Sequence, residues 1–338
     1  MITARTIRNL LRCITPWRTW NMLRMLASYR LSVWSGRSIV WGLPYTLTIE
    51  PTNRCNLSCP ECPSGNGTMT RPQGLLSLDE FRRIVEEVRR EVFYLQLFFE
   101  GEPFINNRLL EMVEYAHERR MYVSVSTNAH YLRPEVAQRV IASKLDRLIV
   151  SVDGLTQEVY EEYRVGGSLQ KVHDALEHFA AARREAGSSC RTELTLQFLV
   201  TRQNEGQIDE LRVLAQRYGA NVALKTIQVY SIEGAENFLP RNERYSRYER
   251  VNGELRTKNR LHNRCVRLWE RSVITWDGTV VPCCFDKDAE YPLGQLSDGS
   301  FEEIWQSESY HDFRRRILHN RKDVDMCRNC TEGLKIYR

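Results

Sequence analysis

Three cysteines stand close together near the start of the chain, in the run Cys55-Asn-Leu-Ser-Cys59-Pro-Glu-Cys62. Three thiolates in one short loop can bind three irons of a cubane iron–sulfur cluster and leave the fourth iron open to another ligand. A closed zinc site takes four ligands, usually as two pairs, and only three cysteines cluster here. The spacing therefore favours a [4Fe–4S] cluster with one open iron over a structural zinc site.

A second group of four cysteines lies in the last quarter of the chain, at Cys265, Cys283, Cys327 and Cys330. Four thiolates are enough to close a second iron–sulfur cluster, and they are equally able to form an all-thiolate zinc site. Nothing in the sequence points to an oxidising compartment, so clustered cysteines favour metal ligation over disulfides. The residues alone leave cluster and zinc open as alternatives.

Strand-like and helix-like runs alternate around the first cysteine group. The strands that we expect are Thr46–Glu50, Tyr94–Glu100, Tyr122–Thr127, Arg147–Val152, Glu193–Val200 and Asn221–Gln228. Amphipathic helices such as Leu78–Glu91 and Asn107–Arg119 lie between them. Six such units predict an α/β fold with an incomplete, TIM-like (β/α)6 barrel, in which loops after the strands carry the site.

The Cys-x3-Cys-x2-Cys spacing, directly after the first strand, resembles the signature of the radical S-adenosylmethionine (SAM) superfamily. Further motifs resemble those of the family and follow the later strands in order: Gly101-Glu102, Ser126-Thr-Asn128, Ser151-Val-Asp153, Arg164 and Asn204. Glu100 and Ala129 stand where the family motifs have glycines.

This resemblance implies that Cys55, Cys59 and Cys62 hold a [4Fe–4S] cluster with SAM on its open iron. It also implies a set of SAM-binding residues, namely Gly101, Glu102, Ser126, Asn128, Ser151, Asp153, Arg164 and Asn204. Gln197 and Lys225, on the late strands, are further candidates for substrate contact.

The run Cys265-x12-Gly278-x4-Cys283 is similar to the opening of the SPASM domain, an iron–sulfur extension of many radical SAM enzymes. Three of the seven cysteines of a full SPASM domain are absent, as in its shortened, twitch-type version. The resemblance thus implies one auxiliary [4Fe–4S] cluster on the second cysteine group. The neighbouring Cys284 is left free, either as a packed thiol or as a hydrogen-atom donor to a substrate radical.

Charge is unevenly distributed in a chain whose net charge is +5. No acidic residue precedes Glu50, whereas this stretch carries seven arginines and four tryptophans. Such a segment is typical of a surface that contacts an anionic membrane or an acidic partner, and also of two helices packed on the main domain with their arginines in water. Pro16 separates the two helices that we expect here.

Four domains follow from these patterns: a basic helical extension (1–43), a radical SAM core (44–235), a polar linker (236–262) and an auxiliary-cluster module (263–338). The module is expected to contain a hairpin that turns at Asp277–Gly278, followed by a helix over Phe301–Leu318.

The resemblance implies that SAM is cleaved to a 5′-deoxyadenosyl radical, which abstracts hydrogen from a substrate C–H bond. We expect a small polar substrate, such as a sugar or aminocyclitol, that is dehydrogenated or epimerised by an oxidoreductase. The first alternative is a peptide-modifying maturase, although such enzymes often carry a winged-helix domain that is not evident here. The second is a non-enzymatic iron–sulfur electron carrier.

A flavodoxin- or ferredoxin-type reductant is the expected protein partner, and no nucleic-acid partner is expected. The sequence has no apolar run long enough for a transmembrane helix and no secretory signal. We therefore expect a cytoplasmic protein, with peripheral contact to the inner face of the membrane through residues 1–40 as a further expectation.

Overall fold

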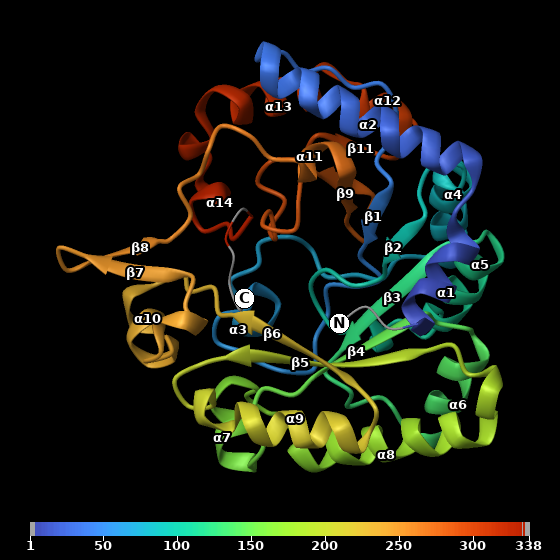
Figure 1. Ribbon diagram of the computed structural model, residues 1–338, viewed down its shortest axis with the longest axis vertical. Helices are drawn as coiled ribbons and strands as arrows, with labels where there is room; N and C mark the ends of the chain where they lie inside the picture. The colour runs from blue at the N-terminus through green and yellow to red at the C-terminus, as the bar shows by residue number, and fades with distance from the viewer. Residues whose placement is uncertain (1–3, 333, 335–338) are drawn as a thin grey trace.

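The protein, described here by a computed structural model over residues 4–332 and residue 334, is built around six parallel strands (Figure 1). Each expected strand is present: β1 Thr46–Ile49, β2 Tyr94–Gln96, β3 Tyr122–Thr127, β4 Arg147–Ser151, β5 Glu193–Val200 and β6 Asn221–Thr226. Every neighbouring pair from β1 to β6 is parallel, and the strands follow one another in chain order. This order is that of an incomplete (β/α)6 barrel and confirms the predicted fold.

Amphipathic helices cover the outside of these strands. The longer ones are α4 Leu78–Val88, α5 Leu109–Glu118, α6 Pro134–Ala142, α8 Leu169–Ala186 and α9 Ile208–Arg217. In α4, Phe81, Ile84 and Val88 repeat at helical spacing and are fully buried in the core. The Ser77 side chain caps this helix by accepting a hydrogen bond from the Glu80 N–H.

The C-terminal part of the chain extends the barrel sheet. Strand β9 (Arg271–Ile274) pairs in parallel with β1, and β10 (Thr279–Val281) and β11 (Gly294–Gln295) continue as antiparallel neighbours. The predicted hairpin at Asp277–Gly278 is thus confirmed, and the sheet has nine strands.

The expected helix over Phe301–Leu318 is two helices, α12 Phe301–Trp305 and α13 Glu308–Asn320. The break occurs at Ser307, whose side chain caps α13 by accepting a hydrogen bond from the Tyr310 N–H.

Two N-terminal helices, α1 (Ala4–Cys13) and α2 (Pro16–Ser35), precede the barrel. Helix α1 lies across the amino ends of the middle strands, where Arg12 forms an ion pair of 3.0 Å with Asp146, just before β4. Thr15 caps α2, and Pro16 takes its first position, where proline's missing N–H has no cost. Helix α2 runs beside α12 and α13 (Figure 1).

The expected polar linker contains ordered structure. An antiparallel hairpin of β7 (Tyr248–Val251) and β8 (Glu254–Thr257) projects from the body (Figure 1). It turns at Asn252 and Gly253, which both have positive φ, as the tight hairpin turn requires.

Short elements complete the described chain. The helices are α3 Pro63–Asn66, α7 Gln157–Tyr163, α10 Ile232–Phe238, α11 Arg267–Glu270 and α14 Asp325–Arg328. The 3-10 turns are Pro103–Ile105, Gly187–Ser189, Glu205–Gln207, Glu243–Tyr245 and Arg321–Asp323. None of the helices described, short or long, has the length and apolar character needed to cross a membrane.

Candidate functional site

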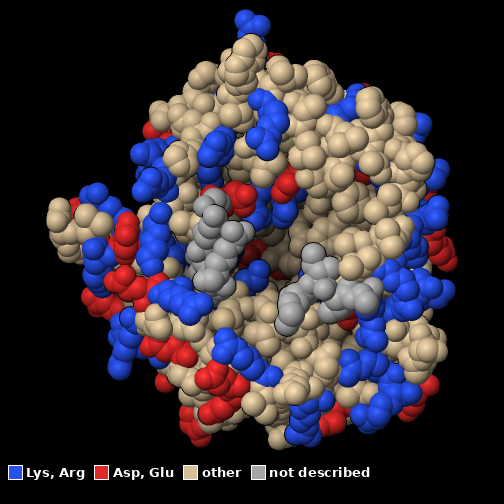
Figure 2. All heavy atoms as spheres, viewed as in Figure 1, with Lys and Arg blue, Asp and Glu red and all other residues tan. Residues whose placement is uncertain are grey.

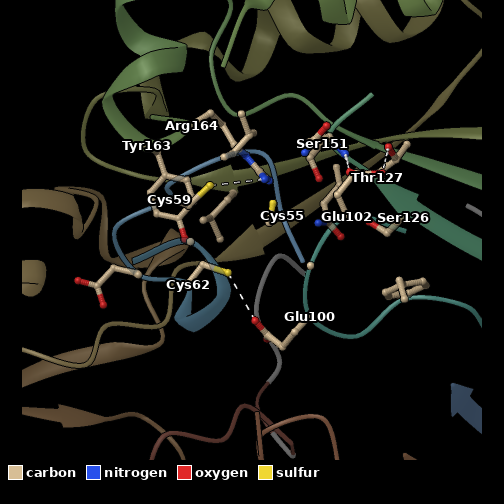
Figure 3. A pocket seen from close by; sticks show the side chains of 18 of the residues that line it. Cys55, Cys59, Cys62, Glu100, Glu102, Ser126, Thr127, Ser151, Tyr163 and Arg164 are labelled. Atoms are coloured by element: carbon tan, nitrogen blue, oxygen red, sulfur yellow. Dashed lines mark hydrogen bonds between the residues drawn. The ribbon is translucent and has the colours of Figure 1, made fainter. Parts of the chain in front are cut away.

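A cavity of about 250 Å³ opens at the carboxyl ends of the strands (Figure 3). Its walls bring together the first cysteine group and most of the predicted SAM-binding residues: Cys55, Cys59, Cys62, Gly101, Glu102, Ser126, Asn128, Ser151 and Arg164. Gln197 on β5 lines the same cavity. Segments more than 100 residues apart in the chain therefore meet at one place, because parallel strands end at the same edge of the sheet.

The cysteine loop is held in shape by its own backbone. The Cys62 N–H donates to the Cys59 carbonyl at 3.2 Å, and the Gly65 N–H donates to the Cys62 carbonyl at 2.8 Å. A side chain at Gly65 would lie 2.6 Å from the Cys59 backbone nitrogen, so this position requires glycine. The loop therefore presents its three thiols from a fixed turn at the cavity wall.

The Cys59 thiol is buried, and those of Cys55 and Cys62 are half-buried beside the apolar cluster that contains Leu57. Burial raises the pKa of Cys62 to about 12, and burial also raises the pKa of Cys55 and of Cys59. The Arg164 guanidinium lies 3.9 Å from the Cys59 sulfur. Binding a metal cluster here must release the thiol protons, and a nearby cation favours the resulting thiolate.

Gly101 and Glu102 connect the β2 loop to the cysteine loop. Gly101 has a φ of +75°, and a side chain there would lie 2.6 Å from the Arg54 carbonyl oxygen. The Glu102 N–H donates to that same carbonyl at 2.7 Å. Only glycine allows the two loops to approach this closely.

The Glu102 carboxylate is buried and ties β2 to β3. It accepts hydrogen bonds from the Thr127 hydroxyl and the Asn128 N–H, both at 2.7 Å, and from the Phe104 N–H. Burial raises the pKa of Glu102, and these hydrogen bonds oppose that shift. The Asn128 side chain in turn donates to Asn56 in the cysteine loop at 2.9 Å.

Asp153 and Asn204 lie behind the cavity, outside its lining. Asp153 binds the Arg164 guanidinium at 2.6 Å and accepts a hydrogen bond from the Leu199 N–H. The Asn204 amide donates to the carbonyls of Asp153 and Leu199. Both residues hold the arginine and the strand ends in position, and direct contact of either with a ligand stays a prediction.

Glu100, which departs from the family motif, has partners on both sides of the cavity. It accepts a hydrogen bond from the Cys62 thiol at 3.5 Å and pairs with Lys287 of the C-terminal module at 3.4 Å. Lys287 itself lines the cavity. Sequence reasoning missed Lys287, and the only signal for it was the unusual acidic residue at position 100, which needs a counter-charge when buried.

The second cysteine group also meets in space. Cys265, Cys283, Cys327 and Cys330 line one small pocket with apolar neighbours such as Phe313 and Ile317. The Cys330 sulfur accepts hydrogen bonds from Arg321 at 3.4 Å and from the Glu332 N–H at 3.2 Å, and the Cys283 sulfur accepts one from the Phe285 N–H at 3.4 Å.

Cys284 is outside the lining of that pocket, as the spacing count predicts. Lys225 on β6 is exposed, and Cys284 lies near enough to favour its charged form. Neither Cys284 nor Lys225 lines the cavity of the first cysteine group.

The donor sets fit iron–sulfur clusters. All seven cysteines are free of disulfides, and their sulfurs receive N–H groups and cations, as cluster thiolates do. Three thiols face a cavity with room for a further ligand, and four thiols share a small pocket that is lined by apolar side chains and by Arg267 and Arg321. In the part of the chain that the structure describes, no three His, Cys, Asp or Glu side chains form a site for a single metal ion.

Comparison with known proteins agrees with this arrangement. The radical SAM superfamily profile matches residues 49–211, and the profile of the SPASM iron–sulfur cluster-binding domain matches residues 265–331. Together with the site geometry, these matches define the class: the chain belongs to the radical SAM superfamily and carries a SPASM domain. Members of this class hold a [4Fe–4S] cluster and SAM in the barrel and auxiliary iron–sulfur clusters in the SPASM domain.

Among curated relatives, the chain is similar to the mycofactocin maturase MftC of three species, among them Mycobacterium ulcerans and Mycolicibacterium smegmatis. It is 37% identical to the Mycobacterium ulcerans protein over 186 residues, which is 55% of this chain and 48% of the relative. It is 29% identical to the Mycolicibacterium smegmatis protein over an alignment of 321 residues. That alignment covers 85% of this chain and 75% of the relative. The chain thus spans about half the length of the first relative and three quarters of the length of the second.

Solved structures share the fold. Streptococcus suis SuiB bound to S-adenosylmethionine has a TM-score of 0.65 at 14% identity, over 88% of this chain and 74% of that one. BtrN in complex with AdoMet and 2-DOIA has a TM-score of 0.54 at 18% identity, over 85% and 93%.

Proposed function

We propose that this chain cleaves SAM reductively and uses the resulting radical to modify a peptide. Cys55, Cys59 and Cys62 would hold the cluster, and a flavodoxin- or ferredoxin-type protein would supply its electron. One observation carries the first half of the proposal: these three thiols line the same cavity as the SAM-motif residues. When bound, the cluster supplies the electron that splits SAM into methionine and a 5′-deoxyadenosyl radical, which takes a hydrogen atom from a substrate C–H bond.

In this proposal the residues that line the cavity bind the amino-acid part of SAM. Arg164, oriented by Asp153, offers a guanidinium to the SAM carboxylate. The Glu102 oxygen that accepts only the Asn128 N–H retains a lone pair for the SAM amino group. Gly101 keeps the backbone close enough for such contacts.

The peptide substrate is supported by the curated relatives. The chain is 31% identical over 191 residues to a Granulibacter bethesdensis protein named PqqA peptide cyclase, and other relatives are named maturases. A second cavity of about 460 Å³ shares Lys287 with the first and offers room for a long substrate. These observations favour the peptide alternative over the small polar substrate that was the main expectation.

The second cysteine group would hold an auxiliary [4Fe–4S] cluster within a module of residues 263–338. The N–H groups and the Arg321 cation at its sulfurs are suited to a cluster that changes charge. Cys284 stays a candidate hydrogen-atom donor on the barrel side of this module.

The first experiment tests SAM cleavage. Anaerobically reconstituted, reduced protein is expected to convert SAM to 5′-deoxyadenosine, measured by liquid chromatography. Replacing Cys55, Cys59 and Cys62 together with alanine should abolish the product. Cys190→Ala, at a buried cysteine outside both groups, should retain it. Product formation by the triple variant would contradict the proposal.

The second experiment tests the substrate class. Short peptides encoded by open reading frames near this chain's gene, deuterated at their side chains, are incubated one at a time with reduced protein and SAM. Deuterium in 5′-deoxyadenosine and a changed peptide mass are expected. A sugar or aminocyclitol that is converted in place of the peptide would restore the small-molecule alternative and leave SAM cleavage intact.

A further inference from the structure

The outward surface of α1 and α2 is apolar. Most of the large hydrophobic side chains that are exposed in the described chain belong to residues 7–41, and Trp34 is the most exposed of them at 85%. A patch of this kind on a folded protein usually marks a contact surface. Its position on two connected helices separates it from the SAM cavity at the strand ends.

In these helices the polar side chains are turned toward the body of the protein, and the apolar side chains are turned toward solvent. The buried positions of α2 are mostly polar: Arg18, Asn21, Ser28 and Ser32 face the body, along with Met25. Asn21, for example, exchanges hydrogen bonds with the Leu43 backbone at 2.8 Å and 3.2 Å. The apolar side chains of Trp20, Leu23, Leu31 and Trp34 recur at spacings that place them together on the opposite, exposed face.

The charge on these two helices has one sign, and the neighbouring Glu91 carboxylate accepts a hydrogen bond from the Trp17 indole at 2.8 Å. No acidic residue occurs before Glu50, and the exposed residues include Arg8, Arg30 and Arg37. Over α2, the surface in Figure 2 is tan with scattered blue, while red gathers lower on the molecule. An apolar face that carries tryptophan and is bordered by arginine matches the interface of an anionic bilayer.

We propose that the exposed apolar face of α2, together with the exposed apolar residues of α1, docks on an anionic lipid surface. Neither helix can cross a membrane, so the contact is peripheral. A second copy of the chain fits the face poorly, because a symmetric pairing would bring arginines together without any acid from these helices to neutralise them. The proposal is independent of the substrate of the SAM site.

Deleting residues 1–40 would be a poor test of docking. The inner faces of these helices form buried contacts with the body, such as Arg12 with Asp146 and Arg18 with the Arg89 and Arg119 carbonyls. Substitutions confined to the outer face leave these contacts in place, so they separate docking from folding.

The full-length holoprotein is therefore mixed with vesicles of phosphatidylcholine alone and of equimolar phosphatidylcholine and phosphatidylglycerol, and binding is measured by co-sedimentation. Binding to the anionic vesicles is expected, weakening as salt screens the arginines. The double variant Leu23→Ser/Trp34→Ser should bind at least about tenfold more weakly, because two side chains lose burial in the interface. Leu23 and Trp34 are 51% and 85% exposed, so folding should be unaffected.

The matched control is Val213→Ser/Ile232→Ser, at apolar residues that are 68% and 79% exposed on other helices. It should bind vesicles as the unmodified protein does, and all three proteins should form 5′-deoxyadenosine at equal rates without lipid. Equal binding by the test and control variants would overturn the proposal. So would equal binding to neutral and anionic vesicles, or self-association in solution that Leu23→Ser/Trp34→Ser abolishes.

Discussion

At the scale of single residues, the cavity depends on contacts that other residue types could not make. Glu102 uses both carboxylate oxygens to join the β2 and β3 loops, and Asp153 fixes the guanidinium of Arg164. Each of these side chains is buried, so the energy of a lost partner would not be recovered from water. Among the SAM-motif residues, Glu102 therefore lines the cavity, and Asp153 shapes it from behind.

Gly101→Ala tests the close approach of the two loops. The new methyl group would meet the Arg54 carbonyl at 2.6 Å on a backbone with a φ of +75°. We expect SAM affinity to fall at least about tenfold, or about 1.4 kcal/mol, with iron content unchanged. Calorimetric titration of SAM into the reconstituted protein measures this.

Gly253→Ala is the control for backbone strain alone. Its φ is +85°, but no atom lies within 4 Å of the added carbon. It should lower stability by about 1 kcal/mol and leave SAM affinity intact. Equal SAM affinity in both variants would contradict the clash argument.

His117 on α5 is expected to make the stability of the protein depend on pH. Burial lowers its pKa to about 4 from 6.5, and Arg12 and Lys144 act in the same direction. Its contribution to stability is therefore present above pH 6.5 and is lost as the pH falls towards 4. We expect it to remove roughly 2 kcal/mol over that range, after allowance for partial exposure.

The measurement is urea unfolding at about pH 7 and about pH 5, compared between the unmodified protein and His117→Gln. The variant cannot take up this proton, so it should lose less stability on acidification. An equal loss in both proteins would exclude His117 as the titrating group.

At the scale of elements, α1 belongs to the barrel although it precedes the first strand by some thirty residues in the sequence. Its polar side chains contact the amino ends of the strands opposite the cavity: Thr6 bonds to Glu193 on β5, and Asn9 to the Arg191 carbonyl. In an incomplete barrel this end must be covered, because the strands would otherwise expose buried polar groups. Helix α1 supplies that cover.

Arg12→Met tests this role of α1. Asp146 is fully buried, and the substitution removes its only ion-pair partner among the described residues while keeping most of the side-chain volume. An unpaired buried carboxylate is expected to cost about 3 kcal/mol in the free energy of unfolding. Arg30→Met, on the exposed face of α2, should change it by less than about 0.5 kcal/mol. Similar unfolding midpoints would show that α1 contributes little to the barrel.

At the scale of the whole molecule, the SPASM region and the barrel form one structure. Strand β9 pairs with β1 over four residues, and β1 is the strand that leads into the cysteine loop. Glu100 and Lys287 add an ion pair between the two parts at the cavity. The auxiliary cysteine group is thus fixed relative to the first.

Iron content tests the assignment of both cysteine groups. The unmodified protein should bind about eight irons after anaerobic reconstitution, and a Cys327→Ala/Cys330→Ala variant about four. That variant should still cleave SAM at a reduced rate but fail to modify substrate. One cluster with one zinc in the unmodified protein would contradict the auxiliary-cluster assignment.

Solubility and the α-helical signal of the variant must be compared with the unmodified protein first, since cluster binding is coupled to folding. A well-folded variant that modifies substrate at the normal rate would limit the auxiliary cluster to a structural role.

The sequence alone determined the strands, because each is a short apolar run bounded by turn residues, and it determined the first cysteine group, because its ligand spacing is local. The second group is spread over residues 265–330, and its members were joined only by the resemblance to the SPASM domain. Cys55, Cys59 and Cys62 could be assigned to one loop without any coordinates. The boundaries of β3 and β5 matched to the residue.

Only the tertiary structure decided contacts between distant segments. The pairing of Lys287 with Glu100, the addition of β9 beside β1 and the outward direction of the apolar face of α2 each depend on how elements pack. The spacing of apolar residues in the sequence indicates that a helix has an apolar and a polar face. It does not indicate which of the two packs against the body of the protein. In α2 the polar face is buried, because the backbone groups it covers need hydrogen-bond partners more than the core needs further apolar area.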